Sequence, residues 1–474
     1  MKEQKLFDAI TNLPDEIIAE AAFTPPRKKR LRKWHIPAVA AVLALCFFLG
    51  SVLWPDGATL GMVANAAYLA EYPERVRAVD YGAIGYDKAS EALRKERLEL
   101  RLSADFDRSG LDGFTKALTQ QLLGENESQN RVFSPINVYM ALSVLAETAG
   151  ADSRQQILDI LGESSIDTLR GRANSLWNNV YRDDGKTKTL LANSLWLRAD
   201  TKYSERTLKT IAENYYASTF FGEMGSSKLD SALRDWMNKN TENFLSDQIE
   251  GVKLDPDAVM TVVSTVYYKG VWSKMFSSAK NTSDVFHATD GDREVTFMNE
   301  SRDSTYYWSD NFVATYKSLS QGGMWLVLPD EGVTPEELLY DDSFWNMVQG
   351  GSSVERKAIK IDLSVPKFDI SDEADLIDSL KALGVSNVFD MEKADFSPLT
   401  KDWDMIWVNK VVHGARLKID EEGAEGAAYV KVTAPGAAPP LEDRVELKLD
   451  RPFVFVLTNS DNIPLFVGIV HNPQ

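Results

Sequence analysis

The chain has 474 residues, of which 44% are hydrophobic, and a formal net charge of −18 at pH 7. This acidic balance argues against nucleic acid as a partner. A single cysteine, Cys46, excludes an intrachain disulfide, so the fold has to be held by packing alone. A chain of this length can bury a large core and usually forms more than one unit.

The N-terminal region combines basic residues with a long apolar run. Residues 1–34 form an amphipathic segment followed by a cluster of arginines and lysines. Residues 36–54 carry no charge and are numerous enough to cross a bilayer as a helix. The basic cluster predicts that the N-terminus stays in the cytoplasm and that the chain after Trp54 lies outside the cell. A cleaved signal peptide is the alternative, but its basic region would extend over residues 1–34, which is too long.

The sequence therefore divides into four parts. We expect a cytoplasmic amphipathic and basic segment (1–34), a transmembrane helix (35–54), an extracellular spacer (55–104) and a main domain (105–474). The spacer includes a charged stretch, residues 90–100, that is typical of a solvated helix.

The main domain mixes helical and β-rich stretches. The pattern predicts helices near 111–123 and 136–149, and strands near 258–268, 359–370 and 447–457. We find no internal repeat at a period of 20–50 residues. Because helices and strands do not follow a simple βαβ alternation, we expect a mixed α+β fold.

The sequence offers no motif for catalysis or metal binding. It contains neither G-x-S-x-G nor H-E-x-x-H. Residues 185–187 resemble the end of a P-loop, but Val180 stands where a glycine is needed. The four histidines, at positions 35, 287, 413 and 471, are not spaced as metal ligands. We therefore expect no enzyme activity, no metal and no cofactor.

Residues 421–433 alternate in the manner of a strand. One parity carries Ala424, Gly426, Ala428 and Val430, and the other is mostly polar. Because strand side chains alternate between faces, this segment can lie in a sheet with small side chains inward. It continues into TAPGAAPPLED (433–443), which is typical of an exposed loop. The sequence thus predicts a segment with two possible locations.

Five stretches of the chain, in the right order, resemble the signatures of the serpin family. They are NRVFSPINVYMALSVLAETAG (130–150) with SRQQILDILG (153–162), STVYYKGVWSKMF (264–276), IDLSVPKFDIS (361–371), VNKVVHGARLKIDEEG (408–423), and LKLDRPFVFVL (447–457) with NSDNIPLFVGIVHNP (459–473). The resemblance covers about residues 105–474 and implies a large central sheet that can accept a loop as an extra strand.

The resemblance implies a mechanism of protease inhibition. A reactive loop acts as bait, and the nucleophile of a serine or cysteine protease attacks the scissile carbonyl to form an acyl-enzyme. The cut loop then inserts into the main sheet as a strand and distorts the protease active site. The native fold that stores this strain persists through a kinetic barrier.

The family pattern assigns the hinge of the loop to the start of the alternating segment. Inward side chains of an inserting hinge must be small and uncharged, because an unpaired buried charge costs several kcal/mol. Gly426 and Tyr429 differ from the usual alanine and small residue, but no bulky or charged side chain faces inward. The implied hinge residues are Glu421, Gly423, Ala424, Glu425, Gly426, Ala427 and Ala428.

Two counts place the cleavage site differently. Counted from Glu421, the family spacing puts the reactive bond between Ala437 and Ala438. A small residue there suits an elastase-like or subtilisin-like pocket. Counted back from the C-terminal signature, the cut falls near Leu441, which favours a chymotrypsin-like enzyme. We prefer Ala437.

The resemblance also implies residues that control opening of the sheet. Ser134, Asn137, Ser264 and His413 match a polar cluster beneath the loop. Asn137 stands where a serine is usual and Ser264 where an asparagine is usual, and this exchange between facing positions can preserve the hydrogen bonding. Trp272 matches a tryptophan under the top of the sheet, where the hinge enters.

These expectations combine into one interpretation and one alternative. We expect a membrane-anchored monomeric serpin that traps extracellular serine proteases covalently. The alternative is a non-inhibitory interaction protein, which senses cleavage of its loop and signals inward through its anchor.

Overall fold

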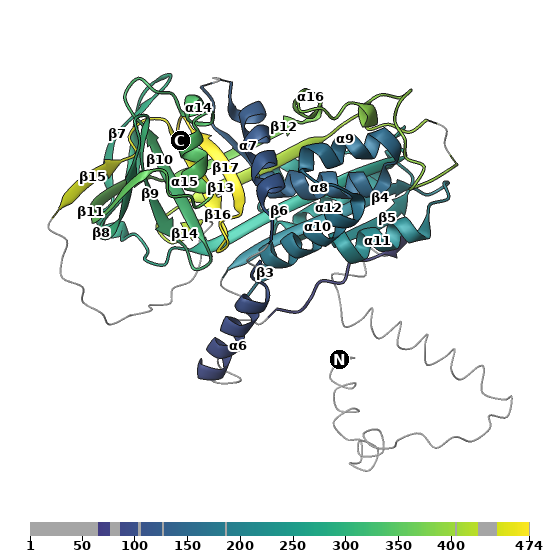
Figure 1. Ribbon diagram of the computed structural model, residues 1–474, viewed down its shortest axis with the longest axis horizontal. Coiled ribbons are helices and arrows are strands. Elements are labelled where there is room, and N and C mark those ends of the chain that lie inside the picture. Colours follow the sequence, from purple (N-terminus) through teal and green to yellow (C-terminus); the bar gives the residue numbers. More distant parts are fainter. Residues whose placement is uncertain are drawn as a thin grey trace, which may run out of the picture. The chain divides into compact units, whose positions relative to one another are not determined.

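The computed structural model describes residues 65–75, 86–102, 106–125, 128–184, 187–402, 405–424 and 443–473, all within one compact unit, Leu60–Gln474. Two β-sheets and a group of helices build this unit (Figure 1). The mixed α+β class predicted from the sequence is confirmed.

The first sheet contains the segment that the sequence assigned to the hinge. Its order is β1-β5-β4-β6-β14-β13-β12, with β3 paired to β4 off this path. Neighbouring strands are antiparallel except for β4 and β5. The strands are β1 (Asn65–Tyr68), β3 (Arg182–Asp183), β4 (Lys188–Arg198), β5 (Ala217–Gly222), β6 (Met260–Val271), β12 (Phe368–Asp375), β13 (Val412–Ile419) and β14 (Gly423–Ala424).

The second sheet has the order β15-β11-β8-β9-β10-β16-β17-β2, with β7 paired to β8. Two regions predicted as single strands are each divided by a proline, which cannot donate to the strand ladder. Pro366 ends β11, and Pro452 precedes β16. The strands are β2 (Arg131–Phe133), β7 (Thr282–Ala288), β8 (Gly291–Trp308), β9 (Phe312–Ser318), β10 (Gly323–Pro329), β11 (Glu355–Pro366), β15 (Arg444–Lys448), β16 (Phe453–Thr458) and β17 (Pro464–Val470).

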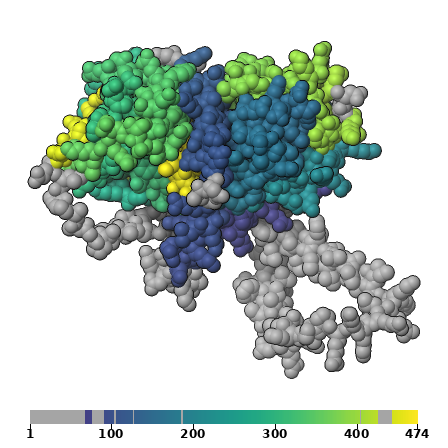
Figure 2. Space-filling model, in the orientation of Figure 1, coloured from purple at the N-terminus to yellow at the C-terminus, as the bar shows by residue number. Residues whose placement is uncertain are grey.

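Most of the long helices gather beside the first sheet (Figure 1). Figure 2 shows α7, in blue, on the surface between the green strands of the second sheet and the teal helices. The helices are α6 (Tyr86–Glu99), α7 (Ser109–Leu123), α8 (Pro135–Thr148), α9 (Ala151–Leu161), α10 (Ile166–Val180), α11 (Glu205–Tyr215), α12 (Ser227–Asn240), α13 (Ser246–Ile249), α14 (Pro335–Leu338), α15 (Asp342–Val348) and α16 (Ile377–Ala382), with short 3-10 turns η2 (Ser278–Lys280) and η3 (Asn387–Phe389).

Helix α8 lies in the core behind the strands that flank the hinge. The Ser134 side chain caps it by accepting a hydrogen bond from the backbone N–H of Asn137 at 3.4 Å, and Pro135 occupies the first turn. Every residue of α8 except Ala141 is buried, as expected of a helix that is apolar on nearly all sides. The helix contacts both β6 and β17, so it connects the two sheets.

Helices cover both faces of the first sheet, as β4 demonstrates. Leu191 and Leu195 belong to the main core, which also contains α8 and α11 side chains. Ala192 and Trp196, on the opposite parity, pack with side chains of α12 in a second core. At β4, therefore, both faces of the first sheet are covered.

Residues 65–75, which the sequence assigned to a spacer, pack against the main domain. Strand β1 pairs with β5 at the edge of the first sheet. The ring of Tyr72 contacts Trp177, Tyr181 and Tyr216, with centroid distances of 5.1, 5.4 and 6.4 Å. The packed structure therefore begins before residue 105. A helix, α6, forms where the charged stretch at 90–100 predicts one.

No helix among the described residues combines the length and apolar character that a membrane span needs. The cytoplasmic segment at 1–34 and the expected span at 36–54 lie outside the described residues, so both assignments stay predictions.

Candidate functional site

The hinge begins at a tight turn that follows β13. The side-chain Oδ1 of Asp420 accepts hydrogen bonds from the backbone N–H groups of Glu422 at 2.9 Å and Gly423 at 3.2 Å. The backbone N–H of Asp420 donates to the Gly423 carbonyl at 3.0 Å. An aspartate that bonds to the backbone two residues ahead reverses the chain, and here it turns the hinge back along β13.

Two hinge residues lie within the first sheet as strand β14. Gly423 is opposite Val271 and Ala424 is opposite Gly270 on β6, and Ala424 is also opposite Ile419 on β13. Ala424 is 0% exposed. A Cβ atom on Gly423 would lie 2.0 Å from the Gly270 carbonyl oxygen, so only glycine permits this approach. The structure thus places the start of the hinge between β6 and β13.

Trp272 holds the turn from the β6 side. Its indole Nε1 donates to the Asp420 carbonyl at 3.0 Å, and its backbone N–H donates to the Glu422 carbonyl at 2.8 Å. The backbone N–H of Phe276 donates to the Glu421 carbonyl at 3.1 Å. Trp272 is buried and lies where the hinge enters the sheet, the position that the sequence assigned to it.

Glu421 is fixed by two partners from connecting segments, Lys367 between β11 and β12 and Asn281 between η2 and β7. Its Oε1 atom lies 2.6 Å from the Lys367 Nζ and accepts a hydrogen bond from Asn281 Nδ2 at 2.5 Å. Partial burial alone would raise the pKa of Glu421, but the hydrogen bonds from Lys367 and Asn281 outweigh it, so the pKa is lowered. The carboxylate therefore remains charged and holds the hinge near the segment that joins β11 to β12.

Two residues of the expected polar cluster are joined by a hydrogen bond. The backbone N–H of Ser134 donates to His413 Nε2 at 3.0 Å, which connects α8 to β13. His413 is buried, and burial lowers its pKa to about 4, with a smaller opposing effect from Asp372. Since Nε2 accepts a hydrogen bond, the neutral imidazole is the form that fits this site.

The other two residues of the cluster do not form the expected pair. The Ser264 hydroxyl donates to Asn193 Oδ1 on β4 at 2.7 Å, directly across the β4–β6 register. Asn137 Nδ2 is buried and has no hydrogen-bond partner among the described residues. The amide that Ser264 needs is therefore supplied by Asn193, a residue that the sequence analysis missed, and not by Asn137.

The sequence of this chain matches the signature of the family "Serpin (serine protease inhibitor)" over residues 109–473. The chain belongs to the serpin family. By that description, the family is one of serine protease inhibitors.

Individual relatives agree with this membership. The chain is 28% identical over 372 residues to alpha-1-antitrypsin-like protein GS55-MS of Ictidomys tridecemlineatus, an alignment that covers 76% of this serpin and 87% of the relative. Among solved structures, the thermophilic serpin tengpin in its native state matches with a TM-score of 0.70 at 24% identity, covering 78% and 95% of the two chains. The complex of thyroxine-binding globulin with thyroxine matches with a TM-score of 0.64 at 23% identity, covering 77% and 99%. The two structures support the fold alone.

The described histidines of the serpin domain have structural partners. His287 lies 2.8 Å from Asp292 on the surface. His471 bonds to Glu336 at 2.9 Å and to Thr289 at 3.1 Å. Within the described ranges, no group of three or more His, Cys, Asp or Glu side chains is arranged to hold a metal ion.

Several predicted site residues lie outside the described ranges. These are Glu425, Gly426, Ala427, Ala428, Ala437 and Ala438, and the alternative cut near Leu441 lies there too. Their roles stay predictions. The sequence analysis did not single out Lys367 and Asp420, although both lie within the family motifs. The signals that could have identified them are a lysine directly after a proline and an aspartate directly before the hinge.

Proposed function

We propose that this serpin inhibits an extracellular serine protease of elastase-like or subtilisin-like specificity by suicide trapping. The observation that carries the proposal is the position of Ala424, a small residue already enclosed between β6 and β13. A hinge that has begun to enter the sheet can continue as a strand when cleavage releases the other end of the loop.

The register of β14 supports this proposal. Ala424 faces Gly270 on one side and Ile419 on the other. Continued in the same antiparallel register, an inserting strand would bring Val430 level with Ser264 on β6 and His413 on β13. The polar residues Ser264 and His413 would then flank Val430 in the inserted strand.

The alternation of side chains in residues 424–430 also supports loop insertion. On β13, the residues that share the parity of Ile419 are buried, including His413 and Leu417. Gly426, Ala428 and Val430 share the parity of Ala424 and would enter the same interior face. Since all of them are uncharged, insertion would bury no unpaired charge. Tyr429 would face the opposite side, where Val412, Gly414 and Lys418 of β13 are exposed.

The test is to mix the full-length chain, in a mild detergent, with elastase, subtilisin, chymotrypsin and trypsin. We expect a covalent complex with elastase or subtilisin that survives a denaturing gel. Mass spectrometry of the released C-terminal peptide should give Ala438 as its first residue. A peptide that begins after Leu441 would move the reactive bond, and cleavage without any complex would contradict inhibition.

We also propose that residues 36–54 anchor the chain in the cell membrane as a monomer, with the serpin domain outside. The uncharged run and the basic residues before it support this orientation. Protease added to intact cells should remove the serpin domain while the first 34 residues remain protected. Protection of the serpin domain would contradict the orientation.

The sensor alternative differs in what it requires of the N-terminus. Deletion of residues 1–34 should leave inhibition unchanged if trapping is the function. If the chain is a sensor, the deletion would abolish a cellular response to loop cleavage, and no covalent complex would be needed.

A further inference from the structure

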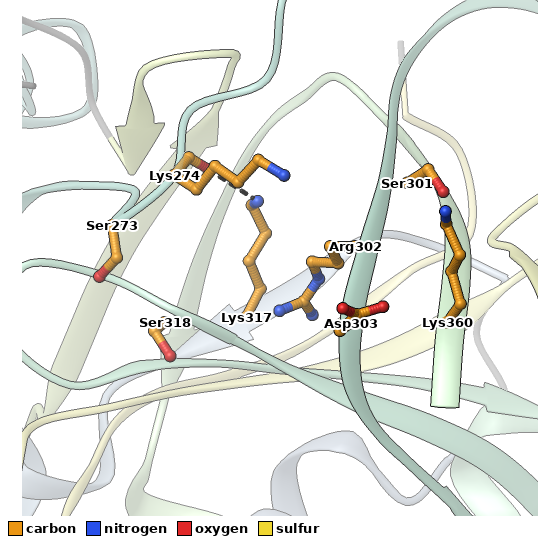
Figure 3. A pocket seen from close by; sticks show the side chains of 8 residues that line it. All are labelled: Ser273, Lys274, Ser301, Arg302, Asp303, Lys317, Ser318 and Lys360. Carbon is orange, nitrogen blue, oxygen red and sulfur yellow. Dashed lines mark hydrogen bonds between the residues drawn. The ribbon is translucent and has the colours of Figure 1, made fainter. Parts of the chain in front are cut away.

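A pocket of about 400 Å³ lies beside the hinge and is lined only by charged residues and serines. Four cationic side chains and one acid contribute to it: Lys274 after β6, Arg302 and Asp303 on β8, Lys317 on β9 and Lys360 on β11. Figure 3 shows Arg302 between Lys317 and Asp303, with Lys274 next to Lys317 and Lys360 directed toward Ser301. This concentration of positive charge stands out in a chain whose net charge is −18.

One buried carboxylate, that of Glu300, lies close to two of these cations. Lys317 Nζ donates to Glu300 Oε1 at 2.5 Å and to the Lys274 carbonyl at 3.0 Å. Arg302 Nε lies 3.3 Å from the same Glu300 Oε1 atom. Burial lowers the pKa of Lys317 to about 8; Glu300 opposes this shift, whereas Arg302 and Lys274 add to it by repulsion. Four cations therefore face two acids, Glu300 and Asp303, so the pocket keeps a net positive charge.

The remaining cations leave donors open to a ligand. The hydrogen bonds of Arg302 to Thr315 and Tyr316 use Nη2, and among the described residues none uses Nη1. No ion pair between described residues includes Lys274 or Lys360. An arginine fork with flanking ammonium groups is the arrangement that recognises oxyanions carrying several oxygens.

We propose that this pocket binds a small polar organic molecule that carries a phosphate or sulfate monoester. The anionic ester group would lie between Arg302, Lys274 and Lys360, and it would relieve the repulsion among the cations. The volume of the pocket exceeds what one oxyanion fills, so the site has room for a polar body such as a sugar. Because no apolar side chain lines the pocket, an apolar ligand would leave the polar groups unpaired.

The position of the pocket links it to the hinge. Lys317 Nζ lies 4.0 Å from the ring centroid of Phe276 and 5.1 Å from that of Trp272. The backbone N–H groups of these two aromatic residues hold the hinge carbonyls of Glu421 and Glu422. A ligand that binds the native form should therefore raise its thermal midpoint by mass action.

The first test is calorimetric titration of the full-length chain at constant ionic strength. The probes are glucose 6-phosphate, glucose 6-sulfate, inorganic phosphate and inorganic sulfate, with glucose and acetate as controls. We expect saturable binding of at least one sugar ester with a Kd below about 1 mM, weaker binding of the inorganic ions, and none of the controls. Tighter binding of glucose 6-phosphate would identify the ligand as a phosphate monoester, and tighter binding of glucose 6-sulfate would identify it as a sulfate monoester. The absence of saturable binding by both esters and both ions would overturn the proposal.

Variants separate this pocket from general surface charge. Lys274→Ala and Lys360→Ala should each weaken binding about tenfold. Lys357→Ala, on the same strand β11 but outside the pocket lining, should change the Kd by less than about twofold. The thermal midpoint of each variant without ligand shows whether the variant folds. If one of the two pocket variants does not fold, the Kd of the other pocket variant tests the site. Equal weakening by Lys357→Ala, or unchanged binding in both pocket variants, would contradict the site.

Discussion

Acid should weaken this serpin through His413, because the native fold holds this side chain neutral. Burial lowers the pKa of His413 from 6.5 to about 4. The unfolded chain keeps the higher pKa, so it binds the proton more readily than the native chain over this range. The free energy of unfolding therefore falls as the pH drops from about 6.5 to about 4.

The size of the effect follows from the shift in pKa. One pKa unit corresponds to about 1.4 kcal/mol, so the full shift of His413 contributes on the order of 3 kcal/mol, and about 2 kcal/mol of this is lost at pH 5. Protonation of Nε2 also removes the acceptor for the Ser134 N–H, which joins α8 to β13. The loss thus falls on a contact that fixes β13 to the start of α8.

The assay is urea unfolding of the parent and His413→Gln at pH 7.5 and pH 5. Glutamine can accept the Ser134 N–H but does not titrate, so the variant should lose about 2 kcal/mol less than the parent between the two pH values. With an m-value of about 2 kcal/mol/M, the urea midpoint of the parent should fall by about 1 M more than that of the variant. His287→Gln, at a surface histidine, is the matched control and should behave as the parent does. Equal losses in the parent and His413→Gln would refute the reasoning.

Three further changes probe the hinge, the reactive bond and the polar cluster. Gly423→Ala should expel β14 from the sheet, because the new Cβ would collide with the β6 backbone; faster proteolysis of the hinge would reveal this, and unchanged proteolysis would contradict the packing. Ala437→Arg should redirect inhibition toward trypsin-like enzymes, whose deep acidic pocket selects a basic residue; no gain in trypsin inhibition would put the cut elsewhere. In a double-mutant cycle, Ser264→Ala and Asn193→Ala should couple by about 1 kcal/mol in unfolding free energy through their 2.7 Å hydrogen bond. A second cycle with Ser264→Ala and Asn137→Ala should be nearly additive. The reverse pattern would show that Ser264 interacts with Asn137, as the sequence suggested, and not with Asn193.

The family motifs predicted the fold class, the buried position of Trp272 and the inward position of Ala424. The position of Ala424 was accessible because a strand alternates with period 2, so this residue could be assigned to one face without knowledge of its neighbours. The alternation beyond Ala424 lies outside the described residues and stays a prediction. The buried helix α8 was equally accessible from its continuous apolar sequence and its Ser-Pro start.

Contacts across the sheet could not be predicted in the same way. Ser264 and Asn193 are 71 residues apart, and their hydrogen bond depends on the register of β4 against β6. Register is set by tertiary packing of both strands, and a shift of one residue would have turned these side chains to opposite faces. The sequence comparison with a family pattern therefore proposed Asn137 as the partner, although Asn193 supplies the amide.

The docking of residues 65–75 also depends on tertiary contacts. Tyr72 belongs to a short segment without strong periodicity, and its burial requires the aromatic surface formed by Trp177 and Tyr216. That surface is assembled from residues more than 100 positions later in the chain. The pocket beside the hinge is similar, because its cations come from four separate segments.

The most direct test of loop insertion is the number of inhibitor molecules consumed for each protease molecule inactivated, compared between the parent and Ala424→Arg. Ala424 is fully enclosed between β6 and β13, so an arginine there would place an unpaired charge in the sheet and should slow insertion greatly. Acylation at Ala437 should proceed normally, so the protease would hydrolyse its acyl-enzyme and leave. We predict that Ala424→Arg is cleaved at the same bond as a substrate, while Glu425→Arg, on the opposite parity, retains most of its inhibition. Equal stoichiometry for Ala424→Arg and the parent would show that loop insertion is not the mechanism of this serpin.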